Sequence, residues 1–454
     1  MTRLGAYLVP ELWWDPHAGF SHLDALIDDA FELGVQAFQV RGGPAEAVRA
    51  LTETLHRRAP EPVLIAMDAE AGVGNLVPEL TPLPPLRALA ALRDPEAIRR
   101  AALLTARQLR ALGVNWVLAP VADLAHPGAL FAEDARSLGE EPQRVAEDVV
   151  TWIDACQSQS VLACARHFPG IGRAVGDGPS PRLTIDADAR TLWGTDLVPF
   201  RGAIDAGVAS LIAGAVAVPG LGRQGRVAAH SSGILSELLR GELGFDGLVV
   251  SDRADGPGMG GPEGAVLAVV DAVRAGCDLV LASDDLEGAV DALQVSVDDG
   301  TLTSEMIEAS AQRRRFWSAW AVPRETREPT LDDLLWARQV ADLVVHPVRG
   351  PWISLGPQVD LTILMMGGRR ASLRPFVETL RAAGHEVRVG ESDGISDGPA
   401  LVVALDAAGA RVVVFGPPEV ARAIPVGAQV LCAWSADRAM QEGAARALSA
   451  RCAT

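Results

Sequence analysis

The sequence predicts an α/β fold, with an N-terminal (β/α)8 barrel followed by a smaller C-terminal α/β sandwich domain. Short apolar runs alternate with amphipathic helical stretches through about residue 330, and eight such runs precede that point. The runs are continuously apolar, which is typical of parallel strands covered by helices on both faces. Charged residues follow several runs in the same phase, as expected at one mouth of a closed, TIM-like barrel.

The eight strands are expected at regular intervals along the first part of the chain: 6–9, 35–40, 63–67, 116–119, 161–165, 210–213, 248–250 and 279–282. Helices are expected between them, because apolar residues recur at helical spacing in residues 23–33, 45–58, 95–112 and 142–157. A closed barrel accounts for eight parallel strands in a chain segment of this length better than an open sheet does.

The composition changes after the last expected barrel helix. Residues 324–329 are polar and end in Pro329, which suits a linker. A helix at 331–343 then leads into a second α/β region, with strands expected at 361–365, 386–389, 411–415 and 429–432 and helices at 373–383 and 438–450. We therefore divide the chain into a barrel at 1–325, a linker and helix at 326–345, and a C-terminal α/β domain at 346–454.

Composition and charge exclude several classes of partner. The 454 residues carry a formal net charge of −18 and include no lysine, so nucleic acid is not an expected partner. No stretch reads as a signal peptide or a bilayer-spanning helix. The five cysteines are scattered, without metal-ligand spacing, and read as buried thiols in a reducing compartment. We expect a cytoplasmic protein without a membrane partner, a metal or an organic cofactor.

Charged residues after five of the expected strands are the candidate site. They are Asp68, Asp123, the pair Arg166 and His167, Asp252, and the pair Asp284 and Asp285. The carboxyl ends of barrel strands converge, so these side chains are expected to share a pocket. Each also has a plainer interpretation: a lone carboxylate after a strand can cap a helix, and a lone histidine is often a hydrogen-bonded structural residue. A Trp13-Trp14 pair after the first strand could stack on a sugar ring or pack against the second domain.

One of these stretches resembles a known family. The run Arg166-His167-Phe168-Pro169-Gly170-Ile171-Gly172, followed by Asp177, resembles the Lys-His-Phe-Pro-Gly-His-Gly…Asp-Ser-His signature of bacterial β-N-acetylglucosaminidases (β-N-acetylhexosaminidases) in glycoside hydrolase family 3. Further segments are similar to that family, and together they cover most of residues 60–285: 113–123, 136–139, 196–200, 239–247, 250–252 and 275–278.

The resemblance implies a role for six residues. Asp252 would be the nucleophile, and Asp177 would be the aspartate that orients a catalytic histidine. The same sugar would be bound by Asp68, Arg136, Arg166 and His167. A carboxylate that attacks the anomeric carbon, assisted by a proton donor on the other side of the scissile bond, is the arrangement of retaining glycosidases.

The chain departs from the family at the proton donor. The resemblance places the donor histidine at Pro179, and proline has no proton to give from its side chain or its backbone nitrogen. Val73 stands where the family has an arginine, while Ala215 and Ile171 stand where it has histidines. Loss of a general acid costs roughly 10²–10⁴-fold in rate. The sequence offers three replacement acids without choosing among them: His17, His126 and Glu70.

Two main functional hypotheses follow. The first is retaining hydrolysis of a terminal β-linked N-acetylhexosamine or a related β-glycoside, with a small carbohydrate as the substrate. The alternative is a catalytically degenerate family member that acts as a sugar-binding or regulatory protein. A third interpretation treats the charged residues as ordinary barrel-mouth loops. The sugar, its linkage and the oligomeric state stay open at this point.

Overall fold

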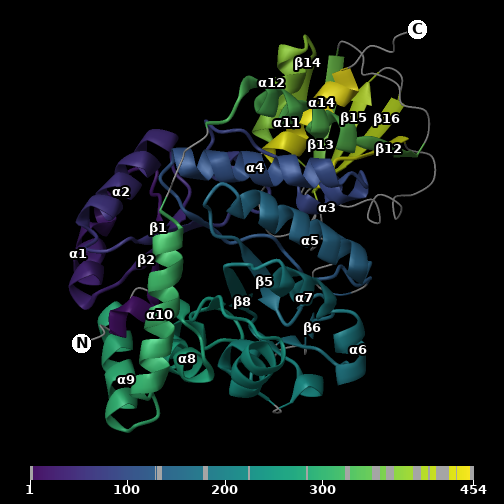
Figure 1. The fold of residues 1–454 in the computed structure, drawn as a ribbon. Coiled ribbons are helices and arrows are strands. Elements are labelled where there is room, and N and C mark those ends of the chain that lie inside the picture. Colours follow the sequence, from purple (N-terminus) through teal and green to yellow (C-terminus); the bar gives the residue numbers. More distant parts are fainter. Residues whose placement is uncertain are drawn as a thin grey trace.

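The computed structural model describes most of the chain, and its elements form an N-terminal body and a smaller C-terminal body (Figure 1). The described residues are 4–127, 129, 135–176, 183–222, 225–282, 285–322, 328–349, 358–364, 373–391, 400–406, 409–415, 429–435 and 437–449.

Eight parallel strands form the sheet of the N-terminal body. They are β1 (Leu8–Trp13), β2 (Ala37–Arg41), β3 (Leu64–Met67), β4 (Trp116–Val117), β5 (Cys164–Phe168), β8 (Ser210–Ala213), β10 (Leu248–Ser251) and β11 (Leu279–Ala282), in the order β4-β3-β2-β1-β11-β10-β8-β5. Hydrogen bonds also join the two ends of this order: the Val117 N–H donates to the Leu162 carbonyl at 2.9 Å, and the Arg166 N–H donates to the Pro120 carbonyl at 3.1 Å. The predicted barrel is therefore confirmed.

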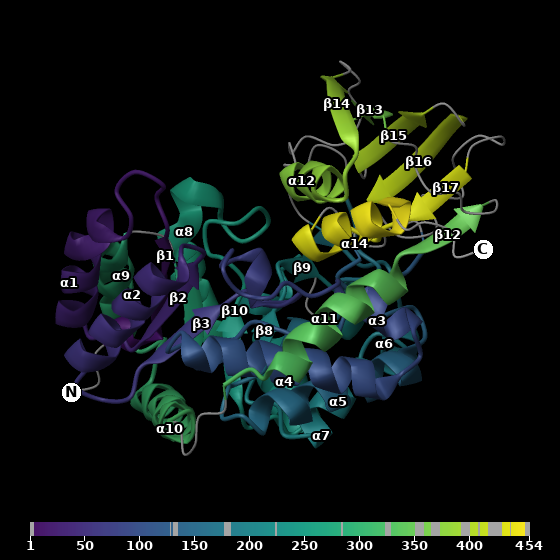
Figure 2. The ribbon, with the colours of Figure 1, turned by 90° about the horizontal axis from the view of Figure 1, so that it is seen from above.

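Helices surround the strands, as Figures 1 and 2 show. The longer ones are α1 (Asp24–Leu33), α2 (Ala45–Arg58), α4 (Pro95–Ala111), α5 (Pro142–Gln157), α7 (Val198–Asp205), α8 (Gly261–Ala275), α9 (Leu286–Asp298), α10 (Ser304–Trp320) and a π-helical segment at Gly233–Glu242. Shorter elements are α3 (Leu86–Ala91), α6 (Ala189–Gly194) and the small strands β6 (Val175–Gly176), β7 (Leu183–Thr184) and β9 (Val216–Ala217). Side chains of Asp94 and Glu141 cap α4 and α5, and proline occupies the first turn of both helices.

Two apolar layers hold the barrel together. Side chains such as Val9, Leu64, Trp116 and Val250 fill its interior, where the Trp116 indole N–H donates to the Ser210 hydroxyl at 2.9 Å. A second, larger cluster joins the outward faces of the strands to the helices. Strand β1 contributes to both layers because its side chains alternate, so that Val9 faces the barrel axis while Leu8 and Leu12 face the helices.

Some element boundaries differ from the prediction. Residues 4–7 form a 3₁₀ turn, so the first strand starts later and runs on through Trp13. The fifth strand begins at Cys164 and includes Arg166 and His167, which the sequence placed just after it. Pairing with β8 extends β5 over these charged residues, with a register shift between Arg166 and Phe168. Tertiary pairing thus overrides the local signal of the charged residues.

The C-terminal body contains a mixed six-stranded sheet in the order β12-β17-β16-β15-β13-β14. Its strands are β12 (His346–Arg349), β13 (Gln358–Leu364), β14 (Glu386–Glu391), β15 (Ala400–Asp406), β16 (Gly409–Phe415) and β17 (Gln429–Cys432). The sequence missed β12 and β15, the two strands that make only antiparallel pairs. Helices α11 (Leu331–Val344), α12 (Arg374–Ala382) and α14 (Arg438–Ser449) accompany the sheet, and α11 lies between α4 and α14 (Figure 2).

The described residues also limit the membrane, metal and thiol chemistry of the chain. Within these ranges no helix is both long enough and apolar enough to cross a membrane. The same ranges hold no group of three His, Cys, Asp or Glu side chains that could bind a metal ion. Cys156, Cys164, Cys277 and Cys432 are buried free thiols, and burial raises the pKa of the Cys164 thiol to about 12. Cys452 lies outside the described residues.

Candidate active site at the mouth of the barrel

Asp68 and Arg166 meet at the carboxyl ends of the strands. Asp68 follows β3, and its Oδ1 lies 2.8 Å from Nη1 of Arg166 on β5. Arg41, the last residue of β2, donates from its own Nη1 to Asp68 Oδ2 at 3.1 Å. Two arginines from neighbouring parts of the barrel therefore hold one carboxylate at its mouth.

Glu70 extends this cluster to Arg136. The Nε and Nη2 atoms of Arg136 donate to the two Glu70 oxygens at 2.7 Å each, and Arg166 pairs with the same carboxylate. The sequence named Glu70 as a possible replacement acid. Two guanidinium partners stabilise the ionised carboxylate, so Glu70 is poorly suited to deliver a proton and better suited to hold the two arginines in place.

Asp123 fixes the His167 ring. Its Oδ2 accepts from His167 Nδ1 at 2.7 Å, and its Oδ1 accepts from the backbone N–H groups of His167 at 3.1 Å and Ile171 at 2.8 Å. Both side chains are buried. The carboxylate requires a proton on Nδ1, so Nε2 of the neutral ring is the nitrogen with a free lone pair.

Asp252 occupies the same mouth but stands apart from the arginine cluster. It follows β10, where its backbone N–H donates to the Ala213 carbonyl of β8 at 3.0 Å. Its Oδ1 accepts from the backbone N–H of Arg253 at 2.9 Å, and the side chain is only half-buried. The structure thus joins Asp68, Arg136 and Arg166 in one network and places Asp252 on its own loop. Asp177 and Pro179 lie outside the described residues.

Three site residues escaped the sequence reasoning: Glu11, Arg41 and Arg253. Glu11 is buried on β1, accepts from Arg41 Nε at 3.0 Å and pairs with Arg253, the residue after Asp252. Glu11 therefore links the loop of Asp252 to the arginine that holds Asp68. The sequence held a signal for two of them. Arg41 directly follows an apolar run, as the other candidate residues do, and Glu11 is a charged residue within an apolar run.

Charge decides the ionisation of Asp68. Burial opposes ionisation, but the guanidinium groups of Arg166, Arg41 and Arg136 outweigh it and hold the pKa of Asp68 below its ordinary value of 3.8. Asp68 is therefore an anion at neutral pH, which accepts hydrogen bonds but cannot donate one.

The other candidate residues have structural roles or lie apart. His126 Nε2 is 2.8 Å from Oδ1 of the buried Asp196, whose other carboxylate oxygen accepts from Arg173 Nε at 2.7 Å. His17 is exposed in the loop after β1. Asp285 caps α9 by accepting from the Gly288 N–H, which confirms the plainer of its two interpretations. Asp284 lies outside the described residues.

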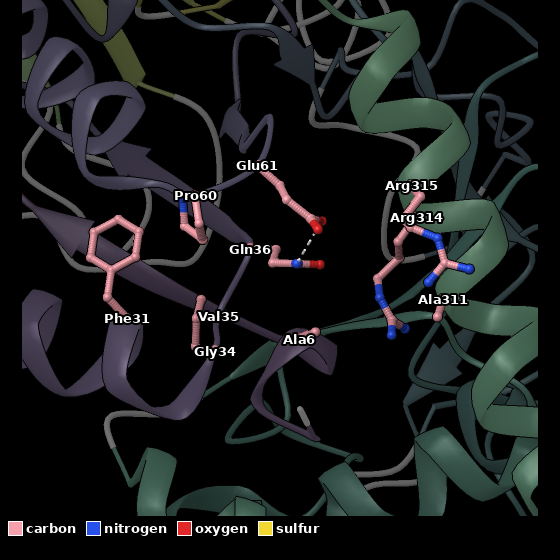
Figure 3. A pocket seen from close by; sticks show the side chains of 10 residues that line it. All are labelled: Ala6, Phe31, Gly34, Val35, Gln36, Pro60, Glu61, Ala311, Arg314 and Arg315. Atoms are coloured by element: carbon pink, nitrogen blue, oxygen red, sulfur yellow. Dashed lines mark hydrogen bonds between the residues drawn. The ribbon is translucent and has the colours of Figure 1, made fainter. Parts of the chain in front are cut away.

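Cavities distinguish the two faces of the barrel. At the mouth, Asp123, Arg136 and His167 line a narrow hollow of about 10 Å³, enough for one water molecule. A cavity of about 400 Å³ lies on the opposite face, between the end of α1, the loop that follows α2, and α10 (Figure 3). Its polar side chains are largely engaged: Gln36 donates to Glu61 at 3.3 Å, and Arg315 pairs with Glu308 at 2.7 Å. Because barrel enzymes carry their sites at the carboxyl ends of the strands, the mouth is the candidate site.

A closed barrel that gathers carboxylates, arginines and a histidine at this mouth belongs to the class of (β/α)8 enzymes. Residues 34–314 match the family model described as "Glycosyl hydrolase family 3 N terminal domain". This match spans more than half of the chain, and the chain belongs to glycosyl hydrolase family 3.

Named relatives agree with this assignment. A "Beta-N-acetylglucosaminidase/beta-glucosidase" of Cellulomonas fimi is 29% identical over 403 residues, which are 81% of this chain and 71% of that protein. A "Beta-hexosaminidase" of Thiobacillus denitrificans is 35% identical over 260 residues, or 55% of this chain and 70% of that protein. Among solved structures, a family 3 β-N-acetylglucosaminidase from Paenibacillus sp. shares the fold with a TM-score of 0.78 at 22% identity, covering 99% of this chain and 96% of the other.

Proposed function

We propose that this protein hydrolyses terminal β-linked N-acetylhexosamine, or a closely related β-glycoside, with retention of configuration and with Asp252 as the nucleophile. The observation that carries the proposal is the position of Asp252. It is a half-buried carboxylate at the barrel mouth, and among the described residues its Oδ1 accepts from the backbone N–H of Arg253. A carboxylate so placed keeps oxygen lone pairs available for attack on an anomeric carbon.

The arginine cluster would bind the sugar that Asp252 attacks. Asp68 is held as an anion and can accept hydrogen bonds from sugar hydroxyls. Arg136 is bonded to Glu70 through Nε and Nη2, which fixes its guanidinium beside Asp68 and Arg166, and we assign it to the same sugar. His167 would present Nε2 as an acceptor. The ion pairs fix these groups before the substrate arrives, which lowers the cost of ordering them.

The mechanism has two covalent steps. In the first, an Asp252 oxygen forms a bond to the anomeric carbon while the bond to the leaving-group oxygen breaks, and that oxygen takes a proton from an acid or from water. In the second, water attacks the anomeric carbon, the bond to Asp252 breaks, and the proton of the water is released. Since Pro179 stands at the family's donor position, we propose that the first step proceeds with little acid assistance.

Leaving-group dependence tests this proposal. Dinitrophenyl and nitrophenyl β-glycosides of N-acetylglucosamine need little protonation and should be cleaved measurably. Alkyl glycosides and disaccharides should be slower by an additional factor of roughly 10²–10⁴. Stopped-flow release of nitrophenolate measures the first step directly, and its pH profile should show one rising limb and no falling limb.

The matched control is Asp252→Ala, which should abolish turnover of even the activated glycosides while far-UV circular dichroism stays unchanged. Efficient disaccharide cleavage with a bell-shaped pH profile would show that another residue donates the proton. Absence of any reaction would favour the second candidate, a sugar-binding or regulatory protein, which Pro179 itself supports.

The four buried free thiols support a reducing compartment, and we propose that the protein resides in the cytoplasm.

A further inference from the structure

Trp13 stands at the rim of the barrel mouth. It is the last residue of β1, and it pairs in register with Arg41, the last residue of β2. Side chains along a strand alternate between its two faces, so Trp13 lies on the same face as Val9 and Glu11. Val9 belongs to the cluster that fills the barrel interior. Trp13 is therefore presented to the barrel axis, above the interior and beside the arginine cluster.

Two contacts hold the indole ring in place. Its Nε1–H donates to Glu11 Oε2 at 3.0 Å, and the Arg41 guanidinium carbon lies 5.1 Å from the ring centroid. Glu11 also pairs with Arg253, and Arg41 also binds Asp68. Trp13 thus contacts Glu11, which pairs with the loop that carries Asp252, and Arg41, which pairs with Asp68.

Despite these contacts, Trp13 is 52% exposed. Its only hydrogen-bonding group is already satisfied by Glu11, so the exposed part of the side chain is apolar ring surface. The neighbouring Trp14 differs, because it packs edge-on against Phe20 with a centroid separation of 5.1 Å. A rigid, anchored aromatic surface left open to the mouth of a sugar-processing barrel is suited to contact a flat apolar face of a ligand.

We propose that Trp13 is the stacking platform for the leaving-group side of the substrate, the aglycone. This inference rests on the proposed function, since it assigns the second half of the glycoside that Asp252 would cleave. The arginines and carboxylates of the mouth suit hydroxyl groups of the sugar that reacts. The open ring of Trp13 suits the apolar face of a following pyranose ring or of an aryl group. The protein would then select glycosides with a flat, ring-shaped aglycone.

Substrates with and without an aglycone ring test the proposal. Trp13→Ala should lower kcat/KM for a nitrophenyl β-glycoside about tenfold, the range expected for loss of one aromatic contact. It should leave kcat/KM for the corresponding β-glycosyl fluoride unchanged, because fluoride is too small to reach a stacking platform. Trp13→Phe keeps a ring face but loses the Glu11 hydrogen bond, and it should recover most of the lost activity.

Phe316→Ala is the matched control, since Phe316 is an aromatic residue on the outer helix α10 and is 61% exposed. It should leave kcat/KM unchanged for both the nitrophenyl glycoside and the glycosyl fluoride. If Trp13→Ala slowed the fluoride and the nitrophenyl glycoside equally, Trp13 would act by holding Glu11 and the proposal would be overturned. No effect on the nitrophenyl glycoside would overturn it too.

Calorimetry separates this inference from the proposed function. If the wild type cleaved no glycoside, the proposed hydrolysis would be rejected, yet Trp13 would still contact bound ligands. The disaccharide of N-acetylglucosamine should then bind about tenfold more weakly to Trp13→Ala than to the wild type, while the monosaccharide binds both equally. Equal losses for the two sugars, or no loss for the disaccharide, would reject the stacking role.

Discussion

Asp123 shows at the scale of one residue how the site is built. A single buried carboxylate satisfies the His167 ring and two backbone N–H groups, so it fixes both a side chain and the turn that follows β5. Buried polar groups that lose such a partner pay the full cost of desolvation. The sequence placed Asp123 at the mouth by its phase after the fourth strand, but its partner lies 44 positions away in the chain.

We predict that Asp123→Ala lowers the free energy of unfolding by about 3 kcal/mol, because it leaves two backbone donors and one imidazole donor buried without an acceptor. Urea denaturation followed by circular dichroism measures the change. Asp29→Ala, at an exposed position on α1, is the matched control and should change little. A similar small loss in both variants would show that Asp123 is not a structural centre of the site.

At the scale of elements, ion pairs join the ends of strands that are far apart in sequence. Glu11 on β1, Arg41 on β2, Asp68 after β3 and Arg166 on β5 form a continuous chain of contacts. Arg253 extends the chain to the loop after β10. Two residues before Glu11, Asp68 and Arg166, the side chains of Val9, Ala66 and Cys164 belong to the apolar cluster of the barrel interior. Along β1, β3 and β5 the barrel therefore changes from an apolar core to a charged mouth.

This network predicts a pH dependence of stability. The pKa of Asp68 is lowered in the folded protein, so its ionised form stabilises the fold above the ordinary value of 3.8, and that contribution is lost as the pH falls through the lower folded pKa. The difference in unfolding free energy between the wild type and Asp68→Asn should therefore be constant near neutral pH and shrink below pH 3.8.

Urea denaturation at a series of pH values from 7 to about 3 would measure this difference, with Asp29→Asn as the exposed control. A difference that grew on acidification would mean that the folded pKa of Asp68 is raised, and the assignment of its arginine partners would be wrong.

At the scale of the whole molecule, α11 connects the two bodies. Its Asp333 closes a capping box with Thr330 and accepts from Arg107 of α4 at 2.7 Å. At the other end, the Val344 carbonyl accepts from the Trp434 indole N–H at 2.9 Å, and Ala88 of the barrel belongs to the apolar cluster of the C-terminal body. The C-terminal body is thus packed on the barrel through a helix that both share.

We predict that Asp333→Ala loosens this packing and lowers the unfolding free energy by about 1–2 kcal/mol, since it removes the Asp333 half of the capping box and a partly buried ion pair together. Differential scanning calorimetry should show the transition splitting in two. Asp332→Ala is the neighbouring control, because its pair with Arg100 is largely exposed and should matter little. Equal effects of the two variants would contradict the role of Asp333.

The sequence by itself predicted the barrel, the order of its strands and helices, and the mouth at which the candidate site lies. Short continuously apolar runs are typical of buried parallel strands, and helical spacing between them favours parallel pairing. Helices 45–58 and 142–157 were predicted to the residue, since α2 and α5 have these bounds. The phase of the charges after the strands likewise marked Asp68, Asp123, Arg166, His167 and Asp252.

Only the tertiary structure decided which charges are partners. The sequence offered Glu70 as one of three possible replacement acids, and the structure pairs it with Arg136 and Arg166. Glu11 lies within β1, where the sequence did not single it out. Arg253 became part of the site only through its ion pair with Glu11, a residue 242 positions away in the chain. An ion pair depends on distance in space, and local sequence patterns report only the face and the end of an element on which a side chain lies. The closure of the barrel is what brings those ends together.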